Sequence, residues 1–435
     1  MFIHVSRPSQ HGAALLPGGW NRIFAAHMDQ LFAHSPAELT FWRRLVRPLV
    51  GQQATPFYLF SVVPIQRALA ELDRAFAGLP VRHWLCCKTQ PLPPLLRWWR
   101  QQGRPIEVVS EYEFRAALAE KFPPAHILVN GPAKHRWLPR QAVAGLFVNF
   151  DSLTEIRALA PLAKRLGWTV GLRLNTREEF DPEAPTHPTQ FGLTAAEALR
   201  AGRALRRAGL ALQCVHFHLR SHVASPAIYE RALQEAAAIC REAGLAPRFV
   251  DCGGGFPPPN VHTLDRQRAD AEFSLAAMAG VCARALKLFP GVEEIWLENG
   301  RWLSARSGVL VVGVVDAKER RGMRHLICDG GRTLHALVAA WEDHALLPLA
   351  RRTGRAVPTT VNGPTCMVFD QLARRRLPRS IRVGDHLLWL DAGAYHLPWE
   401  TRFSHGLAAV LWHDGRQVRT VRGREKFADW WGQWS

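Results

Sequence analysis

The feature that most constrains this chain is a regular alternation of short apolar runs with segments of helical spacing. Eight strand-like runs occur, and helical patterns separate most of them. This rhythm over roughly 220 residues is typical of a (β/α)8 barrel, so we expect an α/β fold. The predicted strands are Val81–Cys87, Ile106–Val109, His126–Asn130, Gly145–Phe150, Thr169–Leu174, Gln213–His218, Arg248–Asp251 and Glu294–Glu298.

Three of the helical segments begin with a capping box, in which Ser or Thr precedes Glu by three residues. The pairs are Ser110 with Glu113, Ser152 with Glu155, and Thr194 with Glu197. We expect these glutamates to bind backbone N–H groups at helix starts rather than to act as catalysts.

The pattern changes near residue 305, where short strand candidates follow one another without intervening helices. This change predicts a second, β-rich domain over residues 306–435, with a helical run at Thr333–Arg351 inside it. The barrel is expected over residues 56–305. Residues 1–55 have no complete fold of their own and are expected to complete the β domain.

The active site of such a barrel lies at the C-terminal ends of its strands. The residues at or just after the predicted ends are Lys88, Asn130, His218, Gly253-Gly254-Gly255 and Glu298. Lys88 ends the apolar run His83–Cys87, where an amine could hold an aldehyde cofactor such as pyridoxal phosphate covalently. The alternative is a strand-end lysine that extends into solvent.

Two further motifs fit a cofactor that carries a phosphate and a basic ring. Gly253-Gly254-Gly255 could turn backbone N–H groups towards an oxyanion, although a flexible turn would look the same. Glu298 could pair with a protonated pyridine nitrogen, and Arg301 could reach the phosphate. A surface salt bridge is the alternative for these two.

Three side chains outside these motifs could also take part. His218 could stack on a planar cofactor, Cys366 follows a turn and could give or take a proton, and Tyr395 could donate to a phosphate. Each has an ordinary structural alternative, namely a satisfied core histidine, a structural cysteine and a packed tyrosine.

The formal net charge of +18 indicates a strongly basic surface. Arginine clusters late in the chain contribute to it, either as a solvated face or as a landing surface for an anionic substrate or an acidic carrier protein. We find no nucleic-acid-binding motif and therefore expect no nucleic-acid partner.

The eight cysteines are scattered, and their spacing suggests no metal site. No run reaches transmembrane length and no convincing secretory signal is present, so we expect no membrane partner. A reducing cytoplasm is the expected location.

Six motifs together resemble the fold-type III pyridoxal phosphate decarboxylases, the diaminopimelate, ornithine and arginine decarboxylase family. The resemblance runs from about Thr55 to Phe403 and implies an alanine-racemase-like barrel with a β-rich domain. The motifs are Cys87-Lys88-Thr89-Gln90-Pro91, His218-Leu219-Arg220-Ser221, Gly253-Gly254-Gly255-Phe256, Glu298-Asn299-Gly300-Arg301, Gly363-Pro364-Thr365-Cys366 and Asp391-Ala392-Gly393-Ala394-Tyr395.

The resemblance also implies roles for these residues. Lys88 would hold pyridoxal phosphate covalently, His218 would stack on its ring, and Glu298 would pair with its nitrogen. Ser221, the glycine turn, Arg301 and Tyr395 would hold the phosphate. In this family the active site lies between the subunits of a homodimer, so Cys366 would reach across to return a proton. Glu107 falls where the family often has an aspartate near the cofactor.

The departures from the family pattern concern the substrate. Met367 stands where ornithine and diaminopimelate enzymes carry an acidic residue for the distal amine, and Arg220 replaces a glycine. Gln90 and Asn299 replace the usual asparagine and proline. With Asp370, Arg220 and Met367 are the candidate specificity residues. They favour an anionic or elaborated amino acid, such as a siderophore precursor or a carrier-linked aminoacyl group.

The predicted activity is α-decarboxylation of an amino acid or a derivative of one. One alternative is a racemase or epimerase on the same fold, which typically has a tyrosine in place of Cys366. A second alternative is an inactive regulatory relative, although such proteins usually lose residues equivalent to Lys88 or Arg301.

Overall fold

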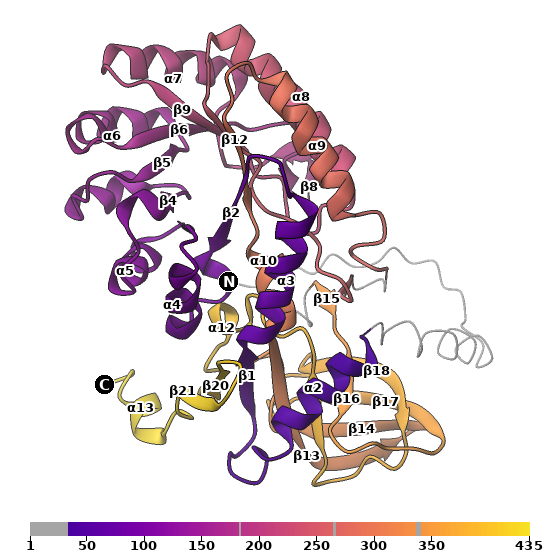
Figure 1. Ribbon diagram of the computed structural model, residues 1–435. Helices are drawn as coiled ribbons and strands as arrows, with labels where there is room; N and C mark the ends of the chain where they lie inside the picture. Colours follow the sequence, from indigo (N-terminus) through magenta and orange to yellow (C-terminus); the bar gives the residue numbers. More distant parts are fainter. Residues whose placement is uncertain (1–33, 182–183, 264–266, 336–340) are drawn as a thin grey trace.

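The computed structural model describes residues 34–181, 184–263, 267–335 and 341–435. A barrel of parallel strands surrounded by helices lies in the upper part of Figure 1, and a β-sheet domain lies below it. The chain passes between them at the start of α3 (Val62–Ala75) and again after α10 (Gly300–Ser304).

All eight predicted barrel strands are present and form one closed, parallel barrel. The last strand pairs with the first, Glu298 lying opposite Trp84, so the sheet has no free edge. The strands are β2 (Val81–Cys86), β3 (Ile106–Val108), β4 (Ile127–Val129), β5 (Phe147–Phe150), β6 (Thr169–Arg173), β9 (Leu212–His216), β10 (Phe249–Asp251) and β12 (Glu294–Glu298). The predicted fold class is confirmed.

Helices cover the outside of this barrel (Figure 1). They are α4 (Pro93–Gln101), α5 (Glu111–Ala119), α6 (Leu153–Leu166), α7 (Ala195–Arg207), α8 (Pro226–Ala243) and α9 (Leu275–Leu288), together with α3. Thr194 and Glu197 form the complete predicted capping box at α7. At α5 and α6 the serine also caps the helix. The glutamate there accepts from the N–H of the residue before that serine, which is Val109 at α5 and Asp151 at α6.

Side chains two positions apart on a strand point to the same face, so successive inward-pointing residues form layers inside the barrel. The lower layer is apolar: the rings of Trp296 and Phe249 stack 4.6 Å apart, and Trp84 lies 5.0 Å from Trp296. Leu128 and Cys214 belong to the same buried cluster. This packing fills the lower part of the barrel. The next inward-pointing residue of each strand, two positions further on, lies above it.

The second domain is a nine-stranded sheet in the order β18-β17-β14-β13-β1-β20-β21, with β19 paired to β13 and β16 paired to β19. Its strands are β1 (Phe57–Ser61), β13 (Gly308–Arg320), β14 (Met323–Cys328), β16 (Leu346–Pro348), β17 (Ala356–Asn362), β18 (Gln371–Pro378), β19 (His386–Trp389), β20 (Ala409–His413) and β21 (Val418–Arg422). The remaining elements are β7 (Phe180–Asp181), β8 (Ala184–Pro188), β11 (His262–Thr263), β15 (Glu342–Asp343), α12 (His396–Trp399) and α13 (Phe427–Trp431).

Parts of the chain before residue 62 also contribute to this sheet domain. α2 (Pro36–Val46) packs Trp42 and Val46 against Phe57 and Leu59 of β1. β1 itself lies between β13 and β20, although the predicted barrel range included it. Residues 1–33 of the predicted N-terminal segment lie outside the described residues.

The helix predicted at Thr333–Arg351 is wrong over residues 341–351, and residues 336–340 lie outside the description. The chain forms β15 and β16 there instead, and β16 pairs antiparallel with β19. Leu346 enters the main core, whereas Leu347 enters the cluster beneath α2. The adjacent leucines that suggested a helix therefore serve the two faces of one buried strand.

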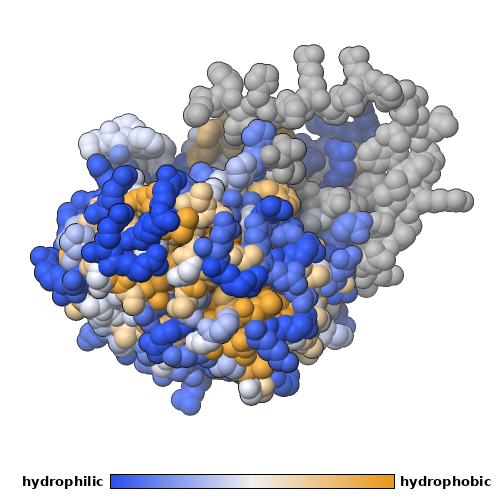
Figure 2. Space-filling model, turned by 90° about the horizontal axis from the view of Figure 1, so that it is seen from above, coloured by the Kyte–Doolittle hydropathy of each residue, from blue (hydrophilic) through white to orange (hydrophobic). Residues whose placement is uncertain are grey.

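Figure 2 shows one face of the molecule, on which hydrophilic side chains surround patches of apolar ones. Within the part of the chain that the structure describes, no helix is both long enough and apolar enough to cross a membrane.

Candidate active site

A layer of polar side chains lies directly above the apolar layer, at the C-terminal ends of the barrel strands. Asn130 donates to Glu298 at 2.6 Å and accepts from Asn149 at 3.0 Å, and Asn149 lies 3.5 Å from Asp251. His216 Nε2 lies 3.4 Å from Glu298. All five side chains are buried, so the mouth of the barrel has a fixed, hydrogen-bonded floor.

Lys88 stands at the edge of this floor. β2 ends at Cys86, and a turn of 3-10 helix, Cys87–Thr89, directs the Lys88 ammonium to Glu107 at 2.6 Å. Burial opposes the charge on Lys88, but its interactions with Cys86, Glu107 and Glu298 outweigh burial and raise the pKa of Lys88 well above its usual value. Glu107, on β3, is therefore the immediate partner of the predicted reactive amine.

Two carboxyl groups share the centre of the floor. Burial, with the nearby charge of Glu107, raises the pKa of Glu298 to about 7. Burial and the closeness of Glu298 also raise the pKa of Asp251 well above its usual value. A cationic ring nitrogen placed against Glu298 would lower the pKa of Glu298 again, since opposite charges favour the ionised carboxylate.

The glycine turn and His218 form one wall of the site. Gly254 donates its N–H to His218 Nδ1 at 3.2 Å. Burial, together with Arg173 and Lys88, lowers the pKa of His218 to about 3, so its ring is neutral.

Side chains could not replace these glycines. A Cβ on Gly254 would lie 2.4 Å from the carbonyl oxygen of Glu298, and one on Gly255 would lie 2.3 Å from that of Arg220. Gly253 and Gly255 also adopt positive φ angles of 65° and 105°. The turn therefore brings bare backbone to the mouth of the barrel.

Arg301 and Tyr395 form the part of the site that faces the sheet domain. The guanidinium carbon of Arg301 lies 4.6 Å from the centre of the Tyr395 ring, and Arg301 forms an ion pair with buried Glu342. The Tyr395 N–H donates to the carbonyl oxygen of Thr89 at 2.8 Å, which ties this corner to the residue after Lys88. Five of the six sequence motifs, from distant parts of the chain, thus meet around one opening.

The sixth motif lies on the loop between β17 and β18. Cys366 is exposed there, whereas the other seven cysteines are buried. Val368 and Phe369 are 99% and 58% exposed, so the loop presents apolar side chains to the outside.

Asp370 holds the Cys366 loop together. Its carboxylate accepts from the N–H of Arg332 at 2.8 Å, the N–H of Thr365 at 3.0 Å and the hydroxyl of Thr365 at 2.6 Å. The side chain is buried. These bonds occupy the carboxylate that the sequence offered as a specificity residue.

Arg220 and Ser221 follow His218 in the loop after β9. Arg220 donates to the carbonyl oxygen of Glu178 at 2.9 Å, and its guanidinium carbon lies 4.5 Å from the centre of the Phe180 ring. Ser221 is exposed beside it. Asn299, the other departure near the site, donates its side-chain N–H to His83 Nδ1 at 2.7 Å.

Comparison with known proteins places this arrangement in a family. Residues 63–305 match the model of the pyridoxal-dependent decarboxylase, pyridoxal binding domain. Diaminopimelate decarboxylase of Actinosynnema pretiosum subsp. auranticum is 30% identical over 76% of both chains. The chain belongs to the pyridoxal-dependent decarboxylases.

More distant members agree with this assignment. Lysine/ornithine decarboxylase of Selenomonas ruminantium is 28% identical over 82% of this chain and 89% of that protein. Diaminopimelate decarboxylase from Helicobacter pylori, solved with L-lysine, has the same fold, with a TM-score of 0.78 and 24% identity over 89% of this chain and 98% of that one. The protein is thus a pyridoxal phosphate-dependent carboxy-lyase that acts on an amino acid.

The decarboxylase site fits its cofactor. Lys88 offers an amine, Glu298 a buried carboxylate, and Gly254 a cradle that a Cβ would fill. The arrangement can therefore hold an aldehyde, a basic ring and a phosphate at one opening.

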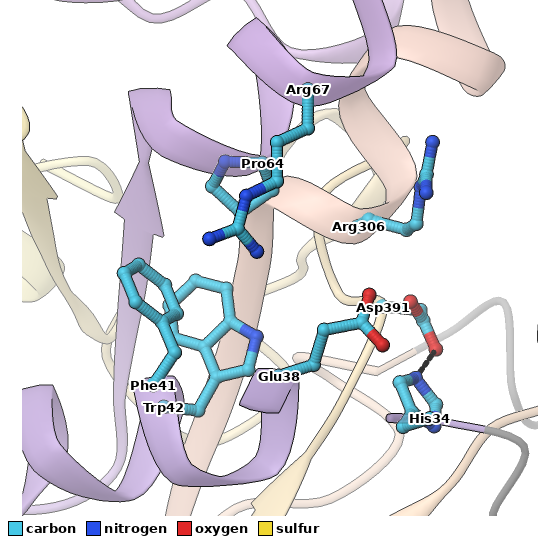
Figure 3. Close-up of a pocket in the computed structure, with 8 residues that line it drawn as sticks. All are labelled: His34, Glu38, Phe41, Trp42, Pro64, Arg67, Arg306 and Asp391. Carbon is cyan, nitrogen blue, oxygen red and sulfur yellow. Dashed lines mark hydrogen bonds and ion pairs between the residues drawn. The ribbon is translucent and has the colours of Figure 1, made fainter. Parts of the chain in front are cut away.

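A separate pocket lies away from this decarboxylase site (Figure 3). There His34 Nε2 lies 2.7 Å from Asp391, the first residue of the turn that ends at Tyr395. The pocket is lined by His34, Glu38, Phe41, Trp42, Pro64, Arg67, Arg306 and Asp391. Because the described lining includes none of the predicted cofactor residues, we assign Asp391 a structural role.

Asn149, Arg173, Asp251 and Glu342 lie near the site and were not predicted as site residues from the sequence. Asn149 and Arg173 are polar residues in apolar strands, and Arg173 forms an ion pair with Glu179 at 2.7 Å. That interruption of an apolar strand was the available signal. Glu342 had no signal because it lay in a segment predicted to be helical.

Proposed function

We propose that this enzyme removes the α-carboxylate of its substrate at the mouth of the barrel, with Lys88, His218 and Cys366 as catalytic residues. The proposal is supported by the meeting of Lys88, His218, Glu298 and the glycine turn around one opening. When bound there, pyridoxal phosphate takes up the electrons that the departing carboxylate leaves on the α carbon.

Different residues around the opening would bind different parts of the cofactor. Lys88 Nζ would hold the aldehyde of the cofactor, and the neutral His218 ring would stack on its ring. Glu298 would accept a hydrogen bond from the protonated ring nitrogen. The backbone of Gly253, Gly254 and Gly255 would lie against the phosphate, and Ser221, Arg301 and Tyr395 would donate hydrogen bonds to it.

Cys366 acts from a second copy of the chain in this proposal. Its loop is exposed and apolar in one copy, and it holds the only exposed thiol. In a homodimer the thiol would reach the partner's opening and donate its proton to the α carbon, which replaces the lost CO2. The free cysteines suit the reducing cytoplasm that we propose as its location.

For the substrate we propose an amino acid without a free distal ammonium, such as one with a further carboxylate or one joined to a larger carrier. Met367 cannot neutralise an ammonium, and the Asp370 carboxylate is occupied by its own loop. Arg220 does not support the proposal, because it binds the Glu178 carbonyl and covers Phe180. The net charge of +18 favours an anionic substrate.

The experiment that tests this proposal is CO2 release in D2O with pyridoxal phosphate supplied. The panel holds diaminopimelate, lysine and ornithine beside amino acids with extra carboxylates, citryl-type conjugates and carrier-linked aminoacyl groups. We expect CO2 and one α-deuteron in the product, with the highest kcat/KM on a substrate that lacks a distal ammonium. Highest kcat/KM on diaminopimelate, lysine or ornithine would refute the substrate proposal, and α-hydrogen exchange without CO2 would indicate a racemase.

A further inference from the structure

Three buried histidines from distant segments meet beneath the Arg301 corner. His335 follows β14, His344 follows β15, and His396 begins α12 directly after Tyr395. Each has at most 1% of its surface exposed. One ring nitrogen of each lies within 4.8 Å of a ring nitrogen of both others.

Hydrogen bonds orient two of these rings. His344 Nδ1 lies 3.1 Å from the carbonyl oxygen of Leu390, and His396 Nδ1 lies 3.0 Å from that of Ala394. A carbonyl oxygen can only accept, so each Nδ1 carries a proton. His396 Nε2 then faces His335, whereas His344 Nε2 lies 2.6 Å from the Glu342 carboxylate. Histidines that bind metals are typically oriented this way, with the second nitrogen donating to a carbonyl or carboxylate.

One ring nitrogen of this cluster is left without a hydrogen-bond partner. His396 Nε2 lies 2.5 Å from His335 Nδ1, and His335 Nε2 is buried with no hydrogen-bond partner. His335 therefore has a bare nitrogen that can bind a metal, and His396 can offer its Nε2 in place of the bond to His335.

We propose that His335, His344 and His396 bind a divalent transition metal of the zinc class, with Glu342 or water in a fourth position. Two nitrogens on one tetrahedral zinc lie about 3.3 Å apart, so His335 and His396 would separate by roughly 0.8 Å. His344 would release to solvent the proton that its Nε2 shares with Glu342 at 2.6 Å, and that nitrogen would then bind the metal. Glu342 would keep Arg301 and His222 as partners.

This site is distinct from the decarboxylase chemistry and does not depend on the proposed function. The metal would link three segments of the chain, one of which contains Glu342 and another Tyr395. It would thereby stabilise the position of both residues, which contact Arg301. Sequence patterns did not predict this site, because the ligands are separated by nine and 52 residues and match no metal-binding spacing.

The test measures metal in the untagged, pyridoxal phosphate-loaded protein. We expect about one zinc per chain by elemental analysis and, after chelation and reloading with Co2+, the visible absorption of tetrahedral cobalt. His335→Gln should weaken Co2+ binding at least about tenfold. The matched control is His325→Gln, a change in the same domain at a residue that contacts Thr360 instead.

Added Zn2+ should also raise the thermal midpoint of the wild type and of His325→Gln, but not that of His335→Gln. The proposal is wrong if the wild type shows no cobalt absorption and no Zn2+-dependent stabilisation. It is equally wrong if His335→Gln, shown to be folded by circular dichroism, binds Co2+ as tightly as the wild type.

Discussion

At the scale of single residues, Lys88 is the side chain on which the cofactor assignment depends. Its ammonium bonds to Glu107 at 2.6 Å at the edge of the polar floor. The neighbouring charges that raise its pKa also fix its position before any cofactor binds. The same contacts therefore determine both where the Lys88 amine lies and how strongly it holds its proton.

Lys88→Ala should abolish turnover and the visible absorbance of lysine-bound cofactor, because the amine that holds the aldehyde is gone. Absorbance spectroscopy and CO2 release measure the two losses, with Lys121→Ala as a control at another lysine. Undiminished turnover in Lys88→Ala would contradict the assignment.

His83 gives a pH prediction at the opposite end of β2. Burial, with the charge of Arg104, lowers the pKa of this residue to about 4, whereas the unfolded chain has a value near 6.5. The unfolded state therefore binds more protons between these values, so stability falls as the pH drops from about 6.5 to about 4. The contribution of His83 to this loss is about 3 kcal/mol.

Urea unfolding at several pH values measures this effect. His83→Gln, which cannot titrate, should show a shallower fall in unfolding free energy over the same pH window than the wild type. Parallel curves for the two proteins would show that His83 does not cause the loss.

At the scale of elements, the loop between β17 and β18 depends on Asp370. Asp370→Ala removes the acceptor of three hydrogen bonds and should cost about 1–3 kcal/mol of stability, with loss of order around Cys366. Denaturant unfolding measures the stability. A substrate-binding role would instead raise KM and leave the unfolding free energy unchanged.

The elements also show what the sequence could predict. Each barrel strand was visible because a local apolar run and a following helix start define it, as with Ser152 at α6. The polar floor was only partly visible, since Asn130 and Glu298 stand at the ends of predicted strands whereas Asn149 lies within one. β15 and β16 were not predictable, because pairing with β19 overrides the helical spacing of their residues.

At the scale of the whole molecule, the proposed homodimer places Lys88 and Cys366 of one site on different chains. Lys88→Ala and Cys366→Ala should each be nearly inactive alone. Mixed and allowed to exchange subunits in equal amounts, they should recover about a quarter of wild-type activity, since half of the dimers have one intact site.

Activity after mixing, with the dimer content followed by size-exclusion chromatography, measures this recovery. Each variant mixed with itself is the control. Exchange without recovery would place Cys366 in the same site as Lys88 of its own chain, or outside the reaction altogether.

The aromatic layer formed by Trp84, Phe249 and Trp296 determines how substrate and products can enter and leave the barrel. Because these rings fill the barrel beneath the polar floor, they close that end to any solute. Substrate must then enter, and CO2 and the product must leave, through the opening at the C-terminal ends of the barrel strands. A product that is still bound there blocks the next substrate, so the rate of product release sets an upper bound on turnover.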